Sequence, residues 1–278
     1  MNHHPRKRFG QHFLRDPIII NRILALIDAK PGQQLIEIGP GQGALTTGLL
    51  TAAGALDVIE IDRDLIEPLA KRCQPFGQLC IHQADALQFD LCTLLNDSCA
   101  AAISESIPAS STQRLRLIGN LPYNISTPLL FHFLKYAHCL DDLHLMLQRE
   151  VVERICAAPG NKTYGRLSVM VQTYCAAEMG FIIHADAFYP PPKVESALLH
   201  LRPYLQPAFA LGNRQHHATL VATAFAQRRK TLRNSLRELI STAQLIAAEI
   251  DPNARAETLT IAEFARLSEL TCNPHISP

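Results

Sequence analysis

A glycine-rich turn between an apolar strand and a helix constrains the fold of this chain more than any other stretch. Residues 34–38 form a short apolar run, Gly39, Gly41 and Gly43 follow at alternate positions, and a helix is expected to about residue 53. Because glycine has no Cβ, such a turn can bring its backbone close to a ligand. Further strands are expected at 56–61 and 79–82, with a helix between them at about 64–73. This alternation predicts right-handed crossovers and a parallel sheet.

The rest of the chain indicates two domains. Later strands are expected at residues 115–119, 143–147, 181–183 and 196–201, and later helices at 149–156 and 166–175. From Pro203 onward only helical periods occur, at residues 219–227, 232–240 and 261–270. We therefore expect an α/β fold, with a basic N-terminal arm and a domain built on the parallel sheet over residues 1–204 and a small all-helical domain over residues 205–278. The Ser- and Ala-rich stretch 98–113 is expected to be a surface loop.

Composition and cysteine spacing indicate the cellular compartment of the protein, but they do not indicate its binding partner. The net charge is only +1, and 18% of the residues are charged, so the whole-chain charge predicts no particular partner. The eight cysteines form no Cys-x-x-Cys pair, which indicates neither a zinc knuckle nor a redox dithiol and favours scattered buried thiols. The N-terminus has no secretory pattern, and no apolar run approaches the roughly 20 residues of a membrane span. We expect a cytoplasmic protein.

The glycine turn alone favours a dehydrogenase and a methyltransferase about equally. Gly39, Gly41 and Ala44 also fit the dinucleotide pattern, and Glu60 lies at the distance expected of a ribose-binding acid. Asp85 changes this balance, because a carboxylate after the third strand can accept a hydrogen bond from an adenine amino group but is unfavourable beside a pyrophosphate. Together with Glu37, it indicates a cofactor with adenosine and an amino acid, such as S-adenosyl-L-methionine.

A second site is expected where Asn120, Leu121, Pro122 and Tyr123 follow a buried strand. The lone pair of an adenine amino group is delocalised into the ring, so this nitrogen is a poor nucleophile. The Asn120 side-chain oxygen and a backbone carbonyl near Leu121 or Pro122 can bind its two hydrogens and favour tetrahedral nitrogen, which can then attack a sulfonium methyl. Tyr123, with Phe188, would stack on the base, for roughly 1–3 kcal/mol per stacked base. The chemistry depends on positioning and electrostatics rather than on a strong base.

Several motifs occur together in one order. They are Gln11-His12-Phe13-Leu14, the stretch from Glu37 to Gly43, Glu60, Asp85, the stretch from Asn120 to Thr127, and Phe188-x-Pro190-Pro191-Pro192-Lys193-Val194. In these motifs the sequence closely resembles the bacterial small-subunit ribosomal RNA adenine dimethyltransferases over nearly its whole length. The resemblance implies a Rossmann-like methyltransferase domain that depends on S-adenosyl-L-methionine. It further implies dimethylation of the N6 amines of two adjacent adenines near the 3′ end of small-subunit rRNA, and a role in small-subunit biogenesis.

The resemblance also assigns residues by position. It implies cofactor contacts at His12, Leu14, Gly39, Gly41, Glu60, Asp85 and Asn120, catalytic roles for Asn120, Leu121, Pro122, Tyr123 and Phe188, and no metal. His12 stands where the family usually has Asn. We expect its imidazole to bond the carboxylate end of the cofactor, with a dependence on pH near its unperturbed value of about 6.5.

Basic clusters predict where RNA binds. The expected contacts are Arg6, Lys7, Arg8, Arg228, Arg229, Lys230 and Arg233. In the expected helix, Arg229, Arg233 and Arg237 form a stripe opposite Leu232, Leu236 and Leu239. A charge run alone is more often a solvated face, but with the resemblance we expect it to contact phosphates. The expected partner is small-subunit rRNA in an immature 30S subunit, bound by a monomer.

Four other functions share some of these sequence features. A dehydrogenase leaves Asn120 to Tyr123 and Asp85 unused. A zinc base deaminase is excluded, because the sequence contains neither H-x-E nor P-C-x-x-C. A non-catalytic RNA-binding assembly factor fits poorly while Asn120 and the glycines are intact. A methyltransferase acting on large-subunit RNA, as the antibiotic-resistance adenine enzymes do, stays open because related folds share this site.

Overall fold

The computed structural model describes residues 10–97, 114–227 and 229–272. The expected RNA contacts Arg6, Lys7, Arg8 and Arg228 and the expected loop 98–113 lie outside these residues. The chain divides into two compact units, which are Met1–Val152 with Glu178–Pro203, and Glu153–Ala177 with Tyr204–Pro278. This division falls beside the expected boundary at residue 204. It also assigns Glu153–Ala177 to the second unit, whereas the expected domain over residues 1–204 includes that segment.

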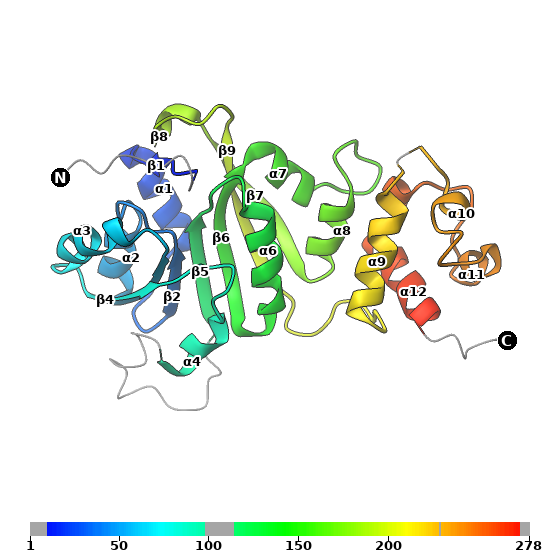
Figure 1. The fold of residues 1–278 in the computed structure, drawn as a ribbon, viewed down its shortest axis with the longest axis horizontal. Coiled ribbons are helices and arrows are strands. Elements are labelled where there is room, and N and C mark those ends of the chain that lie inside the picture. The colour runs from blue at the N-terminus through cyan, green and yellow to red at the C-terminus, as the bar shows by residue number, and fades with distance from the viewer. Residues whose placement is uncertain (1–9, 98–113, 228, 273–278) are drawn as a thin grey trace. The chain divides into compact units, whose positions relative to one another are not determined.

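Unit 1 is built on a mixed seven-stranded sheet in the order β4-β3-β2-β5-β6-β9-β7 (Figure 1). The strands are β2 (Gln34–Ile38), β3 (Ala55–Glu60), β4 (Gln78–Gln83), β5 (Leu115–Asn120), β6 (Leu140–Gln148), β7 (Cys175–Ile183) and β9 (Ser196–Pro203). β4, β3, β2, β5 and β6 run parallel to one another, and β9 runs antiparallel to β6. A separate two-stranded sheet pairs β1 (Phe13–Leu14) with β8 (Phe188–Tyr189). The parallel core that the sequence predicted is confirmed.

The strand order reverses between β2 and β5, and this reversal locates the site. From β2 the chain continues outward to β3 and β4, and then returns to β5 on the other side of β2. The loops at the carboxyl ends of β2 and β5 therefore lead away from each other. In open α/β sheets such a switch point is where ligands bind.

The helices of unit 1 pack on this sheet. They are α1 (Pro17–Ile27), α2 (Thr46–Ala53), α3 (Arg63–Cys73), α4 (Leu94–Asp97), α6 (Ser126–Lys135) and α7 (Arg149–Ile155), with short 3-10 turns η2 (Leu91–Thr93), η3 (Ala137–Cys139) and η4 (Ala185–Ala187). Helices α1, α2 and α3 share one buried apolar cluster with the strands, and Figure 1 shows α6 in front of the sheet. The sequence predicts a helix that starts at Asp16-Pro17, and Asp16 does cap α1, because its Oδ1 accepts the Ile18 amide at 2.8 Å. The sequence also predicts that Ser126 or Thr127 caps α6, and this is wrong, because Ile125 takes the cap position.

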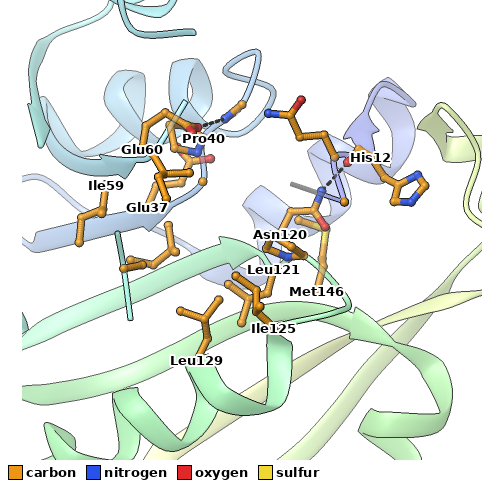
Figure 2. A pocket seen from close by; sticks show the side chains of 18 of the residues that line it. His12, Glu37, Pro40, Ile59, Glu60, Asn120, Leu121, Ile125, Leu129 and Met146 are labelled. Atoms are coloured by element: carbon orange, nitrogen blue, oxygen red, sulfur yellow. Dashed lines mark hydrogen bonds between the residues drawn. The ribbon is translucent and has the colours of Figure 1, made fainter. Parts of the chain in front are cut away.

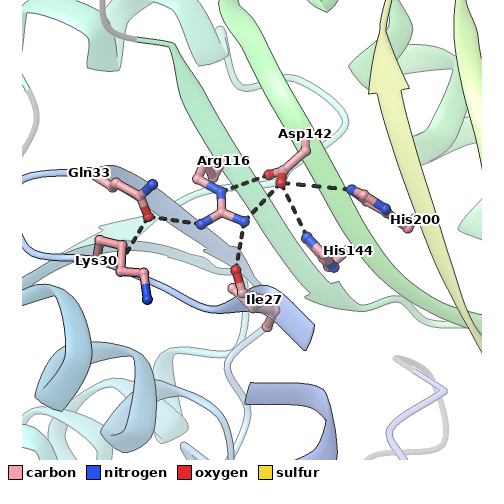
Figure 3. Close-up of polar contacts among 7 residues, drawn as sticks. All are labelled: Ile27, Lys30, Gln33, Arg116, Asp142, His144 and His200. Carbon is pink, nitrogen blue, oxygen red and sulfur yellow. Dashed lines mark hydrogen bonds and ion pairs between the residues drawn. The ribbon is translucent and has the colours of Figure 1, made fainter. Parts of the chain in front are cut away.

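A buried ionic cluster lies near the amino ends of β5 and β6, opposite the switch point (Figure 3). The Arg116 guanidinium donates to both carboxylate oxygens of Asp142, at 3.0 and 2.8 Å, and to the Ile27 carbonyl at the end of α1, at 2.7 Å. The His144 and His200 rings stack beside that carboxylate, with centroids 4.4 Å apart. Burial opposes ionisation of Asp142, but hydrogen bonds from His144 and Arg116, with the His200 ring nitrogen 3.8 Å away, hold its pKa well below the usual range. The cluster ties α1 to strands β5 and β6.

Unit 2 is helical apart from the start of β7. Its helices are α8 (Arg166–Gln172), α9 (Arg214–Phe225), α10 (Leu232–Ser235), α11 (Thr242–Ala247) and α12 (Ile261–Cys272), with η5 (Ala256–Thr258). The helix expected at 232–240 is wrong beyond Ser235. The Leu239 and Ile240 amides both bond the Leu236 carbonyl, and Ser241 then caps α11. Leu232 and Leu236 are buried as expected, but Leu239 is 41% exposed.

A disulfide also departs from expectation. Cys92 and Cys139 form this bond with a Cα–Cα separation of 5.8 Å, within the usual range. No local pattern in the sequence indicated this pair, because 47 positions separate the two residues and the fold brings η2 and η3 together. Cys73 and Cys175 are free and buried, as expected. In the described part of the chain, none of the helices is long and apolar enough to span a membrane.

Candidate active site

A cavity of about 310 Å³ opens at the switch point (Figure 2). Its walls come from the arm before α1, the loop after β2, the end of β3, the loop after β4 and the loop after β5. All the predicted cofactor and catalytic residues except Phe188 line it, namely His12, Leu14, Gly39, Gly41, Glu60, Asp85, Asn120, Leu121, Pro122 and Tyr123. Segments that lie far apart in the sequence therefore form one site.

The glycine turn is held by two contacts, one with the arm and one with β3. Gly41 has φ +56°, in the left-handed region that favours glycine. A Cβ at this position would lie 2.9 Å from the Phe13 ring of the arm, so the arm packs directly on the turn. The Gly39 amide bonds the Ile59 carbonyl at 2.9 Å, which joins the turn to β3. The turn is thus held between the arm and the neighbouring strand.

The cavity is acidic. Glu37, Glu60 and Asp85 line it, and none of its lining residues within the described chain is Lys or Arg. Glu60 accepts the backbone amides of Asp62 at 2.8 Å and Gly41 at 3.3 Å, and burial raises its pKa. Asp85 accepts the Leu87 amide at 2.9 Å, which fixes its carboxylate after β4. An acidic cavity without a basic lining residue favours a cationic ligand.

Glu37 is the most deeply buried of these acids, at 3% exposure. Its Oε2 accepts the Thr46 hydroxyl at 2.6 Å. Burial is the main cause that raises the pKa of Glu37 to about 7. The Thr46 hydrogen bond opposes this shift, and the Glu60 charge adds to it. Near neutral pH this carboxyl group therefore gains or loses a proton in response to a nearby charge.

The Asn120 amide has a defined orientation. Its Nδ2 donates to the His12 backbone carbonyl at 2.8 Å, and a carbonyl can only accept, so the side-chain oxygen is the atom left as an acceptor. In the same loop, the Pro122 carbonyl accepts the Ile125 amide at 3.1 Å. Among the described residues the Leu121 carbonyl has no such donor. Asn120 Oδ1 and the Leu121 carbonyl are therefore the two available acceptors.

Tyr123 is held from two sides. Its hydroxyl lies 2.5 Å from the Ser196 Oγ, and its ring stacks on His12 with centroids 5.6 Å apart and an interplanar angle of 24°. Burial raises the pKa of the phenol, so Tyr123 is neutral at physiological pH.

Two predicted residues lie differently from expectation. Phe188 is 3% exposed, sits in the apolar core opposite Leu14 and does not line the cavity, because the pairing of β1 with β8 turns it inward. The His12 ring is turned toward Pro190, whose carbonyl lies 2.7 Å from Nδ1. The cofactor role expected of this imidazole therefore has no support from its position, although the residue lines the cavity.

Two further residues hold the site, Gln11, which lies in a predicted motif but had no predicted role, and Ser196, which was not predicted. Gln11 Nε2 donates to Asp62 Oδ2 at 3.1 Å, and this contact ties the arm to the end of β3. The position of Gln11 inside a motif was an available signal for its importance. Ser196 had no local signal, because its contact with Tyr123 spans 73 positions.

The predicted RNA contacts that can be placed lie in unit 2. Arg229, Lys230, Arg233 and Arg237 are all exposed. They do not form one helical stripe, because α10 begins only at Leu232 and ends at Ser235.

The strand order, the glycine turn and the acidic cavity define a Rossmann-like methyltransferase with an adenosine-containing cationic cofactor. The chain matches the family model for ribosomal RNA adenine dimethylase over residues 2–272. It is 48% identical over 266 residues to a ribosomal RNA small subunit methyltransferase A of Pseudomonas aeruginosa, covering 96% of this chain and 94% of the relative. It is 49% identical over 270 residues to the protein of that name from Nitrosococcus oceani, with 96% of each covered.

Solved structures agree with this assignment. A dimethyladenosine transferase from Plasmodium falciparum has a TM-score of 0.76 at 25% identity, covering 92% of this chain and 96% of its own. The 23S rRNA methyltransferase ErmE has a TM-score of 0.68 at 23% identity, with 93% and 98% covered, and this likeness concerns the fold alone. The chain belongs to the ribosomal RNA adenine dimethylase family. It is an rRNA adenine dimethyltransferase, and its methyl donor is S-adenosylmethionine.

Proposed function

We propose that this enzyme dimethylates the N6 amines of two adjacent adenines near the 3′ end of small-subunit rRNA, within an immature 30S subunit. The curated relatives that are nearly half identical to it are named for the small ribosomal subunit. We further propose that it acts as a monomer in the cytoplasm, and that residues 205–278 are its small RNA-binding domain.

The arrangement of Asn120 carries the catalytic part of this proposal. Its amide hydrogen bond to the His12 carbonyl directs Oδ1 to act as an acceptor, and the Leu121 carbonyl is the second acceptor. Two acceptors placed on the two hydrogens of an adenine amine favour a tetrahedral nitrogen with a localised lone pair. Tyr123 offers the ring face on which the base stacks, and Pro122 holds the Leu121 backbone extended. Removing one such positioned group typically lowers the rate 10²–10³-fold.

The cofactor would be held by the remaining lining residues. Glu60 would bind the ribose hydroxyls and Asp85 the adenine amine, while Gly39, Gly41 and Leu14, which also line the cavity, would contact the nucleoside and amino-acid parts. S-adenosylmethionine supplies an electrophilic methyl group on a positive sulfur. Glu37 and Glu60 favour that positive charge inside the cavity.

The central experiment is transfer of labelled methyl groups to 30S subunits that lack this modification, followed by mapping of the labelled adenines. We expect label on two adjacent adenines near the 3′ end, and a loss of at least 100-fold in rate for Asn120→Ala at saturating cofactor. Label on large subunits alone would favour the ErmE-like alternative. Absence of RNA label from an enzyme that binds cofactor would contradict the proposal.

The proposed RNA contacts have a separate test. Arg229→Glu together with Arg233→Glu should weaken binding to small subunits at least tenfold and reduce its salt dependence, since each phosphate contact contributes to the salt slope. Cofactor affinity should not change, because Arg229 and Arg233 do not line the cavity. Equal losses of subunit and cofactor affinity would refute this division of roles. Arg255→Glu, at another exposed arginine of unit 2, is the matched charge-reversal control.

A further inference from the structure

We propose that the His12 imidazole is a positioning residue for the target adenine, acting through Tyr123 rather than on the cofactor. This inference rests on the proposed function, because it concerns the base that the site accepts. The imidazole replaces the amide expected in the family, so the role belongs to this chain's own side chain. Three contacts of His12 carry the inference.

The first contact fixes the ring. His12 Nδ1 lies 2.7 Å from the Pro190 carbonyl, and since a carbonyl only accepts, Nδ1 carries the proton. This bond joins the arm to the segment that follows β8, 178 positions later in the chain. The imidazole is therefore anchored away from Glu37 and Glu60, as Figure 2 shows.

The second contact supports Tyr123. The nearly parallel His12 and Tyr123 rings, 5.6 Å apart, cover one face of the tyrosine. The Ser196 Oγ at 2.5 Å holds the hydroxyl end. One face and the hydroxyl are thus held, so a base that stacks on Tyr123 must take the opposite face. Removing the imidazole would free the tyrosine ring to tilt about its hydroxyl bond.

The third contact separates the two roles of residue 12. Its backbone carbonyl, which any residue supplies, accepts the Asn120 amide at 2.8 Å. The next residue, Phe13, packs its ring against Gly41 on the cofactor side. Different groups of the arm thus have different roles. Phe13 packs on the cofactor side and the residue 12 backbone bonds Asn120, while the His12 side chain supports Tyr123.

This division predicts distinct effects for two substitutions. His12→Asn keeps a donor for Pro190 but loses the stacked ring, whereas His12→Phe keeps a ring and loses the donor. We expect the turnover rate on small subunits to fall about tenfold in His12→Asn and less than threefold in His12→Phe. In both variants, affinity for S-adenosylhomocysteine should stay within twofold of the parent. The monomethylated adenine should accumulate in His12→Asn, because a poorly held base is released before its second methyl.

The experiment pairs single-turnover methyl transfer with calorimetric titration of S-adenosylhomocysteine and thermal unfolding of each variant. His138→Asn, at an exposed histidine at the opposite end of the parallel strands, is the control for the exchange itself. Cofactor affinity that falls in step with turnover would overturn the proposal, and so would a His12→Asn enzyme with parental turnover. If His12→Asn unfolds, His12→Phe against His12→Leu gives the same comparison of ring and no ring. If the parent labels a different RNA, the proposed function fails, and the same series on that RNA still tests His12.

Discussion

The carboxyl group of Glu37 couples the charge of the ligand to the stability of unit 1. Its pKa is about 7 in the folded protein, against an ordinary value of 4.5. The folded state therefore holds a proton that the unfolded state releases as the pH rises. Its contribution to stability is full below pH 4.5 and is lost as the pH rises through 7.

Replacing Glu37 by Gln removes the free-energy cost of ionising a buried carboxyl group. It also removes a negative charge from the cavity. We expect Glu37→Gln to raise the free energy of unfolding by about 3 kcal/mol at pH 8 and by less than about 1 kcal/mol at pH 5. The same change should weaken S-adenosylmethionine binding about tenfold at pH 8. Urea unfolding and cofactor titration at both pH values measure these effects. Glu67→Gln, at an exposed acid paired with Lys71, is the control, and a destabilised Glu37→Gln protein would contradict the argument.

At the scale of the residue, sequence and structure agree where chemistry alone selects the side chain. Asn120, Asp85 and Glu60 were predicted because few residue types can bind an adenine amine or a ribose, and all three line the cavity. The direction of the His12 ring could not be predicted. It depends on Pro190, which reaches the arm only through the pairing of β1 with β8.

At the scale of the element, two glycines allow the effect of backbone strain to be distinguished from the effect of packing against the arm. Gly41 and Gly54 both have positive φ, +56° and +81°. A Cβ on Gly41 would contact the Phe13 ring, whereas a Cβ on Gly54, after α2, would meet nothing within 4 Å. The two glycines thus share the backbone requirement but differ in their surroundings.

We expect Gly41→Ala and Gly54→Ala each to lower the free energy of unfolding by about 1–2 kcal/mol, the cost of a left-handed residue with a Cβ. Only Gly41→Ala should also lower cofactor affinity, by at least tenfold, because Phe13 must move. Thermal unfolding and cofactor titration of both variants measure this. Equal cofactor affinities would show that the arm does not need to pack on the turn.

Periodicity predicted the elements well where a hydrophobic pattern and a boundary signal coincide. Asp16 and Pro17 mark the start of α1, and the glycines mark the end of β2. The helix expected at 232–240 failed because Leu232, Leu236 and Ile240 are buried by a short helix and a turn, which give the same spacing as one helix. Phe188 failed as a stacking residue because pairing in a two-residue strand decides which way it faces.

At the scale of the whole molecule, the two units should respond to acid in opposite directions. His217 is fully buried in unit 2, and burial, with the charge of His216, lowers its pKa to about 4. Unfolded histidine titrates near 6.5, so its contribution to stability is full above pH 6.5 and is lost as the pH falls toward 4. Glu37 acts in the opposite sense in unit 1 over much of this range.

We expect unit 2 to lose about 2 kcal/mol between pH 7.5 and 5 from His217, while the Glu37 contribution to unit 1 increases. Hydrogen exchange by mass spectrometry at the two pH values, corrected for intrinsic rates, should show faster exchange in α9 and α12 and not in β2 and β3. His217→Gln should abolish the change in unit 2. Uniform loss of protection in both units would contradict the prediction.

The acidic cavity has a consequence for turnover. Two methyl groups on one nitrogen require two molecules of donor, so the cavity must empty and refill for each adenine. Methyl transfer leaves a neutral thioether in place of a positive sulfur, which removes one of the charges that Glu37 and Glu60 favour. We therefore expect the same carboxylates to bind the spent molecule less tightly than the fresh one. We expect this weaker binding to let the donor exchange while the RNA stays in place.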